Sequence, residues 1–115
     1  MNQTEALVVA ETLLALAAEP GVRVWRQNSG ALPNEHGRFV HFGIKGSSDI
    51  SGIVGPEGWR LEVELKSSTG RLRDSQRAWL EMVAKHGGIG IVARSSQEAL
   101  EGLRAEVANR RRQRT

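Results

Sequence analysis

The sequence contains no cysteine and no tyrosine, and aromatic residues make up only 4% of its 115 positions. The lack of cysteine excludes disulfides and thiolate metal sites, and it agrees with an intracellular protein. So few aromatic residues make a poor platform for stacking single-stranded nucleic acid, and we expect the three tryptophans in the core. Without a basic segment leading into an apolar run, or any long apolar run, we expect neither a secretory signal nor a membrane span.

Aspartate is also scarce, with only Asp49 and Asp74 against eleven glutamates. Asp49 closes a Gly-Ser-Ser turn, and fifteen residues later the chain reads Glu64-Leu65-Lys66. Carboxylate and carbonyl oxygens are the ligands that Mg²⁺ prefers, and a divalent metal is what phosphodiester hydrolysis commonly needs. These two segments are therefore the first candidates for a chemical site.

The positive charge is concentrated at the C-terminus. Residues 104–115 hold five arginines and one glutamate, a net of +4, whereas residues 1–103 carry 11 basic and 12 acidic side chains, a net of −1. The length predicts one domain, 1–115, that ends in a basic tail at about 104–115. The tail is interpreted either as an arm that contacts nucleic acid or as a frayed, solvated helix end.

Hydrophobic periodicity and turn residues predict the order helix, three or four strands, helix, strand, helix. The expected helices are 3–19, 74–86 and 96 to about 110, and the expected strands are 22–26, 38–42, 49–54, 59–66 and 89–93. Residues 28–37 are expected to form a mobile loop. The first helix shows only a narrow polar arc of Glu11, Thr12 and Glu19, which predicts burial on most sides. This order predicts an α/β fold with a mixed sheet.

The alternation of residues 59–66 places Glu64 and Lys66 on one face of a strand, about 6–7 Å apart. With Asp49 on a neighbouring strand, this face could hold a metal ion beside a phosphate. The same residues could equally form the solvated face of an amphipathic strand, with ion pairs across the strands. The spacing alone leaves both interpretations open.

Several blocks of the sequence together resemble a known family. They are Trp25-Arg26-Gln27-Asn28-Ser29-Gly30, Phe42-Gly43-Ile44-Lys45-Gly46-Ser47-Ser48-Asp49-Ile50, Leu61-Glu62-Val63-Glu64-Leu65-Lys66-Ser67, Gly70-Arg71-Leu72 and Gln76-x-x-Trp79. In order and spacing they are similar to the virus-type replication-repair nuclease (VRR-NUC) domain of the PD-(D/E)XK nuclease superfamily. The resemblance runs from about residue 5 to 95. It implies a restriction-endonuclease-like αβββαβ core with a mixed central sheet flanked by helices.

The resemblance implies a role for each matching residue. Asp49 and Glu64 match metal-binding carboxylates, the Leu65 carbonyl matches a backbone metal ligand, and Lys66 matches the catalytic lysine. Gln76 matches a helix glutamine close to the site. The superfamily's proline before the aspartate is replaced by Ser48, which is usual in this family.

Glu5 resembles a first-helix glutamate that serves as an outer metal ligand in many members. Its alternative is a capping-box glutamate that pairs with Asn2 at the start of the helix.

DNA contacts are expected from residues beside these blocks. Arg26 and Asn28 end a strand near the site, with a surface arginine and a turn-forming asparagine as the alternative. Lys45, Ser47, Ser48 and Arg71 flank the motifs and are candidate phosphate contacts.

The resemblance implies a Mg²⁺- or Mn²⁺-dependent DNA endonuclease, similar to archaeal-type Holliday-junction resolvases. Such an enzyme is expected to act as a homodimer on branched DNA such as Holliday junctions or flaps, in replication, repair or recombination. We expect it in the cytoplasm of a bacterium or of a phage-infected host, without contact to a membrane. The alternatives are a non-catalytic DNA-binding subunit with a nuclease fold and a nuclease subunit of a restriction or recombination complex.

Overall fold

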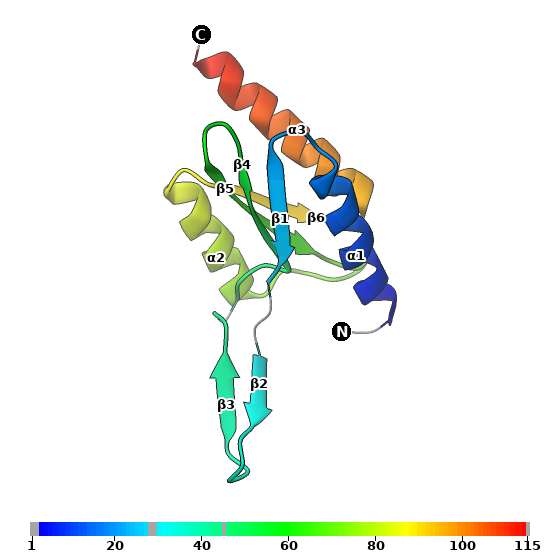
Figure 1. Ribbon diagram of the computed structural model, residues 1–115, viewed down its shortest axis with the longest axis vertical. Helices are drawn as coiled ribbons and strands as arrows, with labels where there is room; N and C mark the ends of the chain where they lie inside the picture. The colour runs from blue at the N-terminus through cyan, green and yellow to red at the C-terminus, as the bar shows by residue number, and fades with distance from the viewer. Residues whose placement is uncertain (1–2, 28–29, 45, 115) are drawn as a thin grey trace.

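The computed structural model describes residues 3–27, 30–44 and 46–114 and shows a mixed α/β architecture (Figure 1). The elements are α1 (Gln3–Ala17), β1 (Val22–Arg26), β2 (Gly30–Pro33), β3 (Phe39–Phe42), β4 (Ile50–Val54), β5 (Trp59–Leu65), α2 (Asp74–Lys85), β6 (Ile89–Ala93) and α3 (Ser96–Gln113). The predicted α/β class is therefore confirmed. No helix in the described ranges is long and apolar enough to span a bilayer.

The main sheet has the strand order β1-β4-β5-β6. β4 pairs antiparallel with both β1 and β5, whereas β5 and β6 run parallel. Parallel neighbours need a crossover, and α2 supplies it between β5 and β6. The mixed sheet expected from the sequence is therefore present; β5 carries Glu64 and Leu65, and Asp49 directly precedes β4.

Helices cover the two faces of this sheet unequally. α1 and α3 lie together on one face, and α2 lies on the other (Figure 1). The core lies under α1 and α3, where Leu16 and Leu103 pack with Leu61, Val63 and Ile91 of the sheet. Burying these side chains is the main stabilising contribution in a domain of this size. The opposite face carries the polar side chains of β5, which α2 partly covers.

α1 is buried on one side only, so the prediction that it is buried on most sides is wrong. Leu7 and Leu14 are 59% and 74% exposed, whereas Thr12, expected in the polar arc, is completely buried. The Thr12 hydroxyl donates a hydrogen bond to the Val8 carbonyl at 2.7 Å. This bond one turn back lets a polar residue face the core without an unpaired donor.

Residues 30–33 form a strand where a loop was expected. β2 pairs antiparallel with β3, and together they form a hairpin that projects from the body (Figure 1). At the tip, the Asn34 side-chain oxygen accepts hydrogen bonds from the amides of His36 and Arg38. The turn residues thus concentrate at the tip, which explains why their abundance predicted a longer loop. The second predicted strand belongs to this hairpin and not to the main sheet.

The basic tail is helical up to Gln113 and is held to the body by ion pairs. Arg104 makes two contacts to Glu19, at 2.6 and 3.0 Å, and Arg111 makes two to Glu57, both at 3.0 Å. Arg110 donates to two backbone carbonyls before β6. Glu57 lies in the β4–β5 turn, at the other end of the sheet from Asp49. The tail therefore has a structural role that its composition did not reveal, and its expected DNA contact stays a prediction.

Candidate functional site

The strand register aligns polar side chains in three rows across the face of the sheet that α2 shares. Trp25 pairs with Ser51, and Ser51 pairs with Glu62, which gives the middle row. Side chains opposite each other on antiparallel strands point to the same face. The row toward the hairpin contains Asp49 and Glu64, and the row away from it contains Arg23, Ile53 and Arg60.

Asp49 lies where the turn after the hairpin enters β4. Its Oδ2 accepts a hydrogen bond from the Leu65 amide at 2.8 Å, and its carbonyl accepts one from the Gln27 amide at 2.9 Å. These bonds fix the short Asp49 side chain across the end of β5. The structure therefore brings together the two segments that the sequence separates by fifteen residues.

The turn before Asp49 depends on glycine. Gly46 has a φ of +83°, and a Cβ placed on it would lie 2.5 Å from the Ser75 carbonyl oxygen of α2. Both the backbone conformation and the close approach therefore require glycine. The turn seats the entry to β4 directly against α2, which holds the other side of the site.

Glu64 is buried, with only 3% of its surface exposed. Its Oε1 accepts a hydrogen bond from Gln76 Nε2 at 3.0 Å and lies 3.5 Å from the Lys66 ammonium. The pKa of Glu64 is raised to about 7, first because burial penalises the ionised form and second because the Asp49 carboxylate repels it. Lys66 partly offsets both effects. The solvated-strand interpretation of this face is therefore wrong.

Gln76 is held in one orientation by hydrogen bonds at both ends of its amide. Its Oε1 accepts from the Arg73 amide at 2.9 Å while its Nε2 donates to Glu64. Gln76 thus satisfies a backbone donor at the start of α2. Because the amide oxygen is already used, only the donor end can face Glu64.

Glu62, Trp79 and Arg60 form a second polar contact between α2 and β5 that sequence reasoning missed. Glu62 is completely buried, and it accepts hydrogen bonds from Trp79 Nε1 at 2.6 Å and from Arg60 Nε at 3.4 Å. Trp79 lies one helical turn after Gln76 along α2, and Glu62 lies two residues before Glu64 along β5. Because the helix and the strand run in opposite directions, Gln76 contacts Glu64 and Trp79 contacts Glu62. The spacings Gln-x-x-Trp on the helix and Glu-x-Glu on the strand were the signal in the sequence from which this second contact could have been found.

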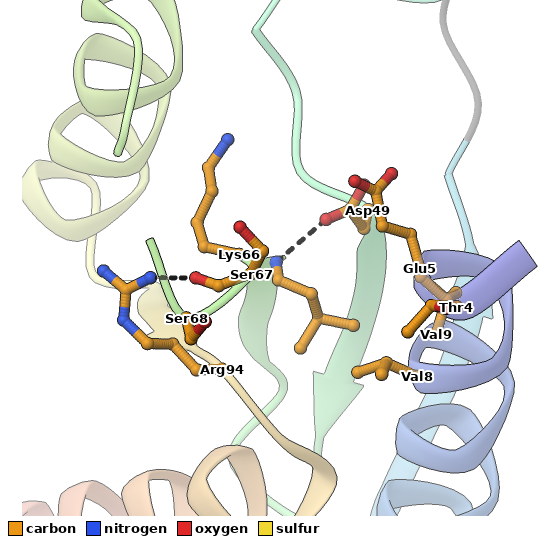
Figure 2. Close-up of a pocket in the computed structure, with 10 residues that line it drawn as sticks. Thr4, Glu5, Val8, Val9, Asp49, Lys66, Ser67, Ser68 and Arg94 are labelled. Carbon is orange, nitrogen blue, oxygen red and sulfur yellow. Dashed lines mark hydrogen bonds between the residues drawn. The ribbon is translucent and has the colours of Figure 1, made fainter. Parts of the chain in front are cut away.

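An open hollow of about 380 Å³ lies over Asp49, Glu64 and Lys66, and Glu5 also lines it. Figure 2 shows the Glu5 side chain reaching from the first turn of α1 toward Asp49. Glu5 therefore shares the hollow with Asp49, and its role as an outer metal ligand stays a prediction. Its alternative partner Asn2 lies outside the described residues.

The residues around the hollow differ in how they could serve a metal ion. Asp49 is close enough to Glu64 for its carboxylate to add to the effect of burial on the pKa of Glu64, and the Leu65 backbone lies beside them. In the described ranges, no three histidine, aspartate or glutamate side chains form a group that could enclose a metal. Mg²⁺ is commonly held by one or two carboxylates while water and substrate phosphate complete its shell. The donor set fits such an open site.

The expected DNA contacts fall into three groups. Arg26, at the end of β1, is exposed, and Arg71 lines the hollow. Ser47 and Ser48 have buried hydroxyls without a hydrogen-bond partner among the described residues, and Ser48 is only 1% exposed, which does not favour a DNA contact. Asn28 and Lys45 lie outside the described residues.

Arg94, which the sequence did not single out, also lies at the site. It donates to the Ser67 carbonyl (Figure 2). It also donates to the Gly70 carbonyl, at 3.0 Å. It thereby ties the loop after Lys66 to the end of β6.

Comparison with known proteins gives one family match. The model of the VRR-NUC domain matches residues 39–97, just over half of the chain. The matched segment contains Asp49, Glu64, Lys66 and Gln76, whereas Glu5 on α1 and Arg26 on β1 lie outside it. No curated protein matches the chain.

Proposed function

The chain belongs to the VRR-NUC domain family of the PD-(D/E)XK nuclease superfamily, and we propose that it is a metal-dependent DNA endonuclease. The observation that carries the proposal is the burial of the Glu64 carboxylate. This carboxylate lies beside Asp49 and Lys66 under an open hollow, although burial disfavours its ionised form. A packing role alone explains such a group poorly. A cation bound at the hollow would offset both the burial and the Asp49 repulsion that raise the pKa of Glu64.

The residues of the site would have different roles in phosphodiester hydrolysis. Asp49 and Glu64 would hold Mg²⁺ or Mn²⁺, with the Leu65 carbonyl and Glu5 as further ligands. When bound, such an ion neutralises phosphate charge and makes a coordinated water more acidic. In the reaction, an oxygen of water bonds to phosphorus while the phosphorus–oxygen ester bond breaks, and the departing oxygen takes up a proton.

Lys66 and Gln76 prepare the site for this reaction. The Lys66 ammonium, 15% exposed and 3.5 Å from Glu64, adds positive charge beside the position of the scissile phosphate. Gln76 donates a hydrogen bond to Glu64 Oε1, and the second carboxylate oxygen of Glu64 would then be left for the metal ion. Arg71 at the rim adds a phosphate contact.

The proposal extends to the kind of DNA. The resemblance to junction resolvases favours branched DNA cut by a homodimer, during replication, repair or recombination inside the cell. The hairpin projects from the end of the sheet that carries Asp49, so DNA at the hollow would pass close to it. A hairpin that projects beside the site supports recognition of DNA shape.

The test is digestion of plasmid and branched DNA with Mg²⁺ or Mn²⁺ by the parent and by Asp49→Asn, Glu64→Gln and Lys66→Met. We expect all three variants to lose cleavage but keep their fold, measured by circular dichroism. Glu81→Gln and Lys85→Met change exposed residues of α2 and serve as matched controls that retain cleavage.

The outcomes separate the candidate functions. Cleavage that survives in all three site variants would refute the nuclease assignment. A parent that binds branched DNA but never cuts it would be a non-catalytic subunit, and one that cuts only with a partner protein would be a subunit of a larger nuclease. A parent that sediments as a monomer on a four-way junction would exclude paired cleavage by a homodimer.

A further inference from the structure

One half of the sheet face beside the site is left uncovered by α2. α2 contacts β5 and β6, whereas β1 and β4 carry exposed side chains on the same face. Trp25 and Ile53 are 40% and 44% exposed, and Arg23 is exposed next to them. The uncovered half begins in the row next to the one that contains Asp49 and Glu64.

Arg60 borders this surface and is held in place from two sides. Its Nε lies 3.4 Å from Glu62, and its guanidinium lies over the Trp25 ring, 5.6 Å from the ring centroid. Glu62 is itself fixed by Trp79 Nε1 at 2.6 Å. Within the described residues, the terminal guanidinium nitrogens make no hydrogen bond, and the side chain is 48% exposed. An arginine ordered in this way loses little entropy when it binds a planar anionic group.

Resting on the proposed nuclease function, we propose that Arg60 and Arg23 bind the DNA backbone a few nucleotides away from the bond that is cut. Arg60 lies four residues before Glu64 on the same face of β5, a distance of about 13 Å. Duplex DNA carries a phosphate about every 3.4 Å of helix axis on each strand, so this distance corresponds to about four base-pair steps. A strand positioned at the hollow would thus cross the uncovered half of the sheet.

The charge of this surface favours DNA over a second copy of the chain. Arg23 and Arg60 are its exposed charged side chains among the described residues, because Glu62 is completely buried. In a symmetric dimer the same patch meets itself, which would bring these cations together. Phosphate groups supply the opposite charge.

The experiment measures binding of branched DNA without divalent metal, so that binding is read separately from cleavage. We expect Arg60→Gln to weaken binding about fivefold to tenfold near 0.1 M salt and to lower the slope of log K against log salt by about one. Arg60→Lys should keep most of that slope because it keeps the charge. Lys85→Gln is the control, since it also removes one positive charge from an exposed side chain, and it should leave the slope unchanged.

A purely structural role for Arg60 gives a different pattern. If Arg60 served only to neutralise Glu62, adding Glu62→Gln to Arg60→Gln would restore parental DNA binding, and that result would overturn the proposal. An unchanged salt slope in Arg60→Gln would do the same, even if the parent cleaves DNA. A dimeric parent that Arg60→Gln converts to a monomer, with the salt slope unaltered, would assign the surface to a second copy instead.

Discussion

Replacing Glu64 by glutamine should stabilise the metal-free protein at alkaline pH. The pKa of Glu64 rises from its ordinary 4.5 to about 7, mainly through burial. One pKa unit corresponds to 1.36 kcal/mol, so ionised Glu64 costs the folded state about 3 kcal/mol above pH 7. Glutamine keeps the acceptor for Gln76 and removes the charge. We therefore expect Glu64→Gln to unfold with a free energy about 3 kcal/mol higher than the parent at pH 8.

The pH dependence follows from the direction of the shift. Between pH 4.5 and pH 7, folded Glu64 keeps a proton that the unfolded chain releases, so the stability of the parent falls as pH rises through this window. The advantage of Glu64→Gln should accordingly be only about 1 kcal/mol at pH 5 and should reach its full value above pH 7.

The assay is urea unfolding in EDTA at pH 5, 6, 7 and 8, followed by circular dichroism. Glu81→Gln, on the exposed side of α2, is the control and should show no comparable trend. If Glu64→Gln gained the same free energy of unfolding at every pH, the explanation from burial of the ionised carboxylate would be refuted. A variant less stable than its parent at pH 8 would show that the Lys66 ion pair outweighs burial. Mg²⁺ at about 100 times its Kd should add about 3 kcal/mol to the parent alone.

Three further substitutions test other contacts. Trp79→Phe removes the hydrogen bond to buried Glu62 and should lower the free energy of unfolding by about 1.5–3 kcal/mol in urea; a loss below about 0.5 kcal/mol would contradict the contact. Gly46→Ala should abolish cleavage and lower the melting temperature more than Gly58→Ala, because both have positive φ but only Gly46 meets a backbone oxygen. Arg111→Ala should lower the melting temperature, and less so in 1 M salt, whereas an effect independent of salt would exclude the ion pair.

The sequence predicted most of the elements and singled out Asp49, Glu64 and Lys66, which line one hollow. The alternation of residues 59–66 predicted the common face of Glu64 and Lys66, and Ser95 caps α3 by accepting from the Glu98 amide at 3.1 Å. These features depend on residues close in sequence, where periodicity and capping chemistry act directly.

Other features depended on which element covers each face of a helix or of the sheet. The periodicity of the sequence does not reveal this. The polar face of β5 became a buried network because α2 places Gln76 and Trp79 over it. Thr12 faces the core because its hydroxyl finds an acceptor within its own helix. Trp25, expected in the core, is 40% exposed because α2 stops short of β1.

The hairpin is structurally separate from the body that holds the site. Its strands pair only with each other, and Leu32, Phe39 and Val40 are all more than half exposed. Substitutions there cost the core almost no packing, so the hairpin can change without disturbing the packing around Asp49, Glu64 and Lys66. Such a division lets one nuclease body acquire different substrate preferences through changes in one short segment. Exchange of hairpins between related nucleases would be a direct route to altered selectivity with the chemistry unchanged.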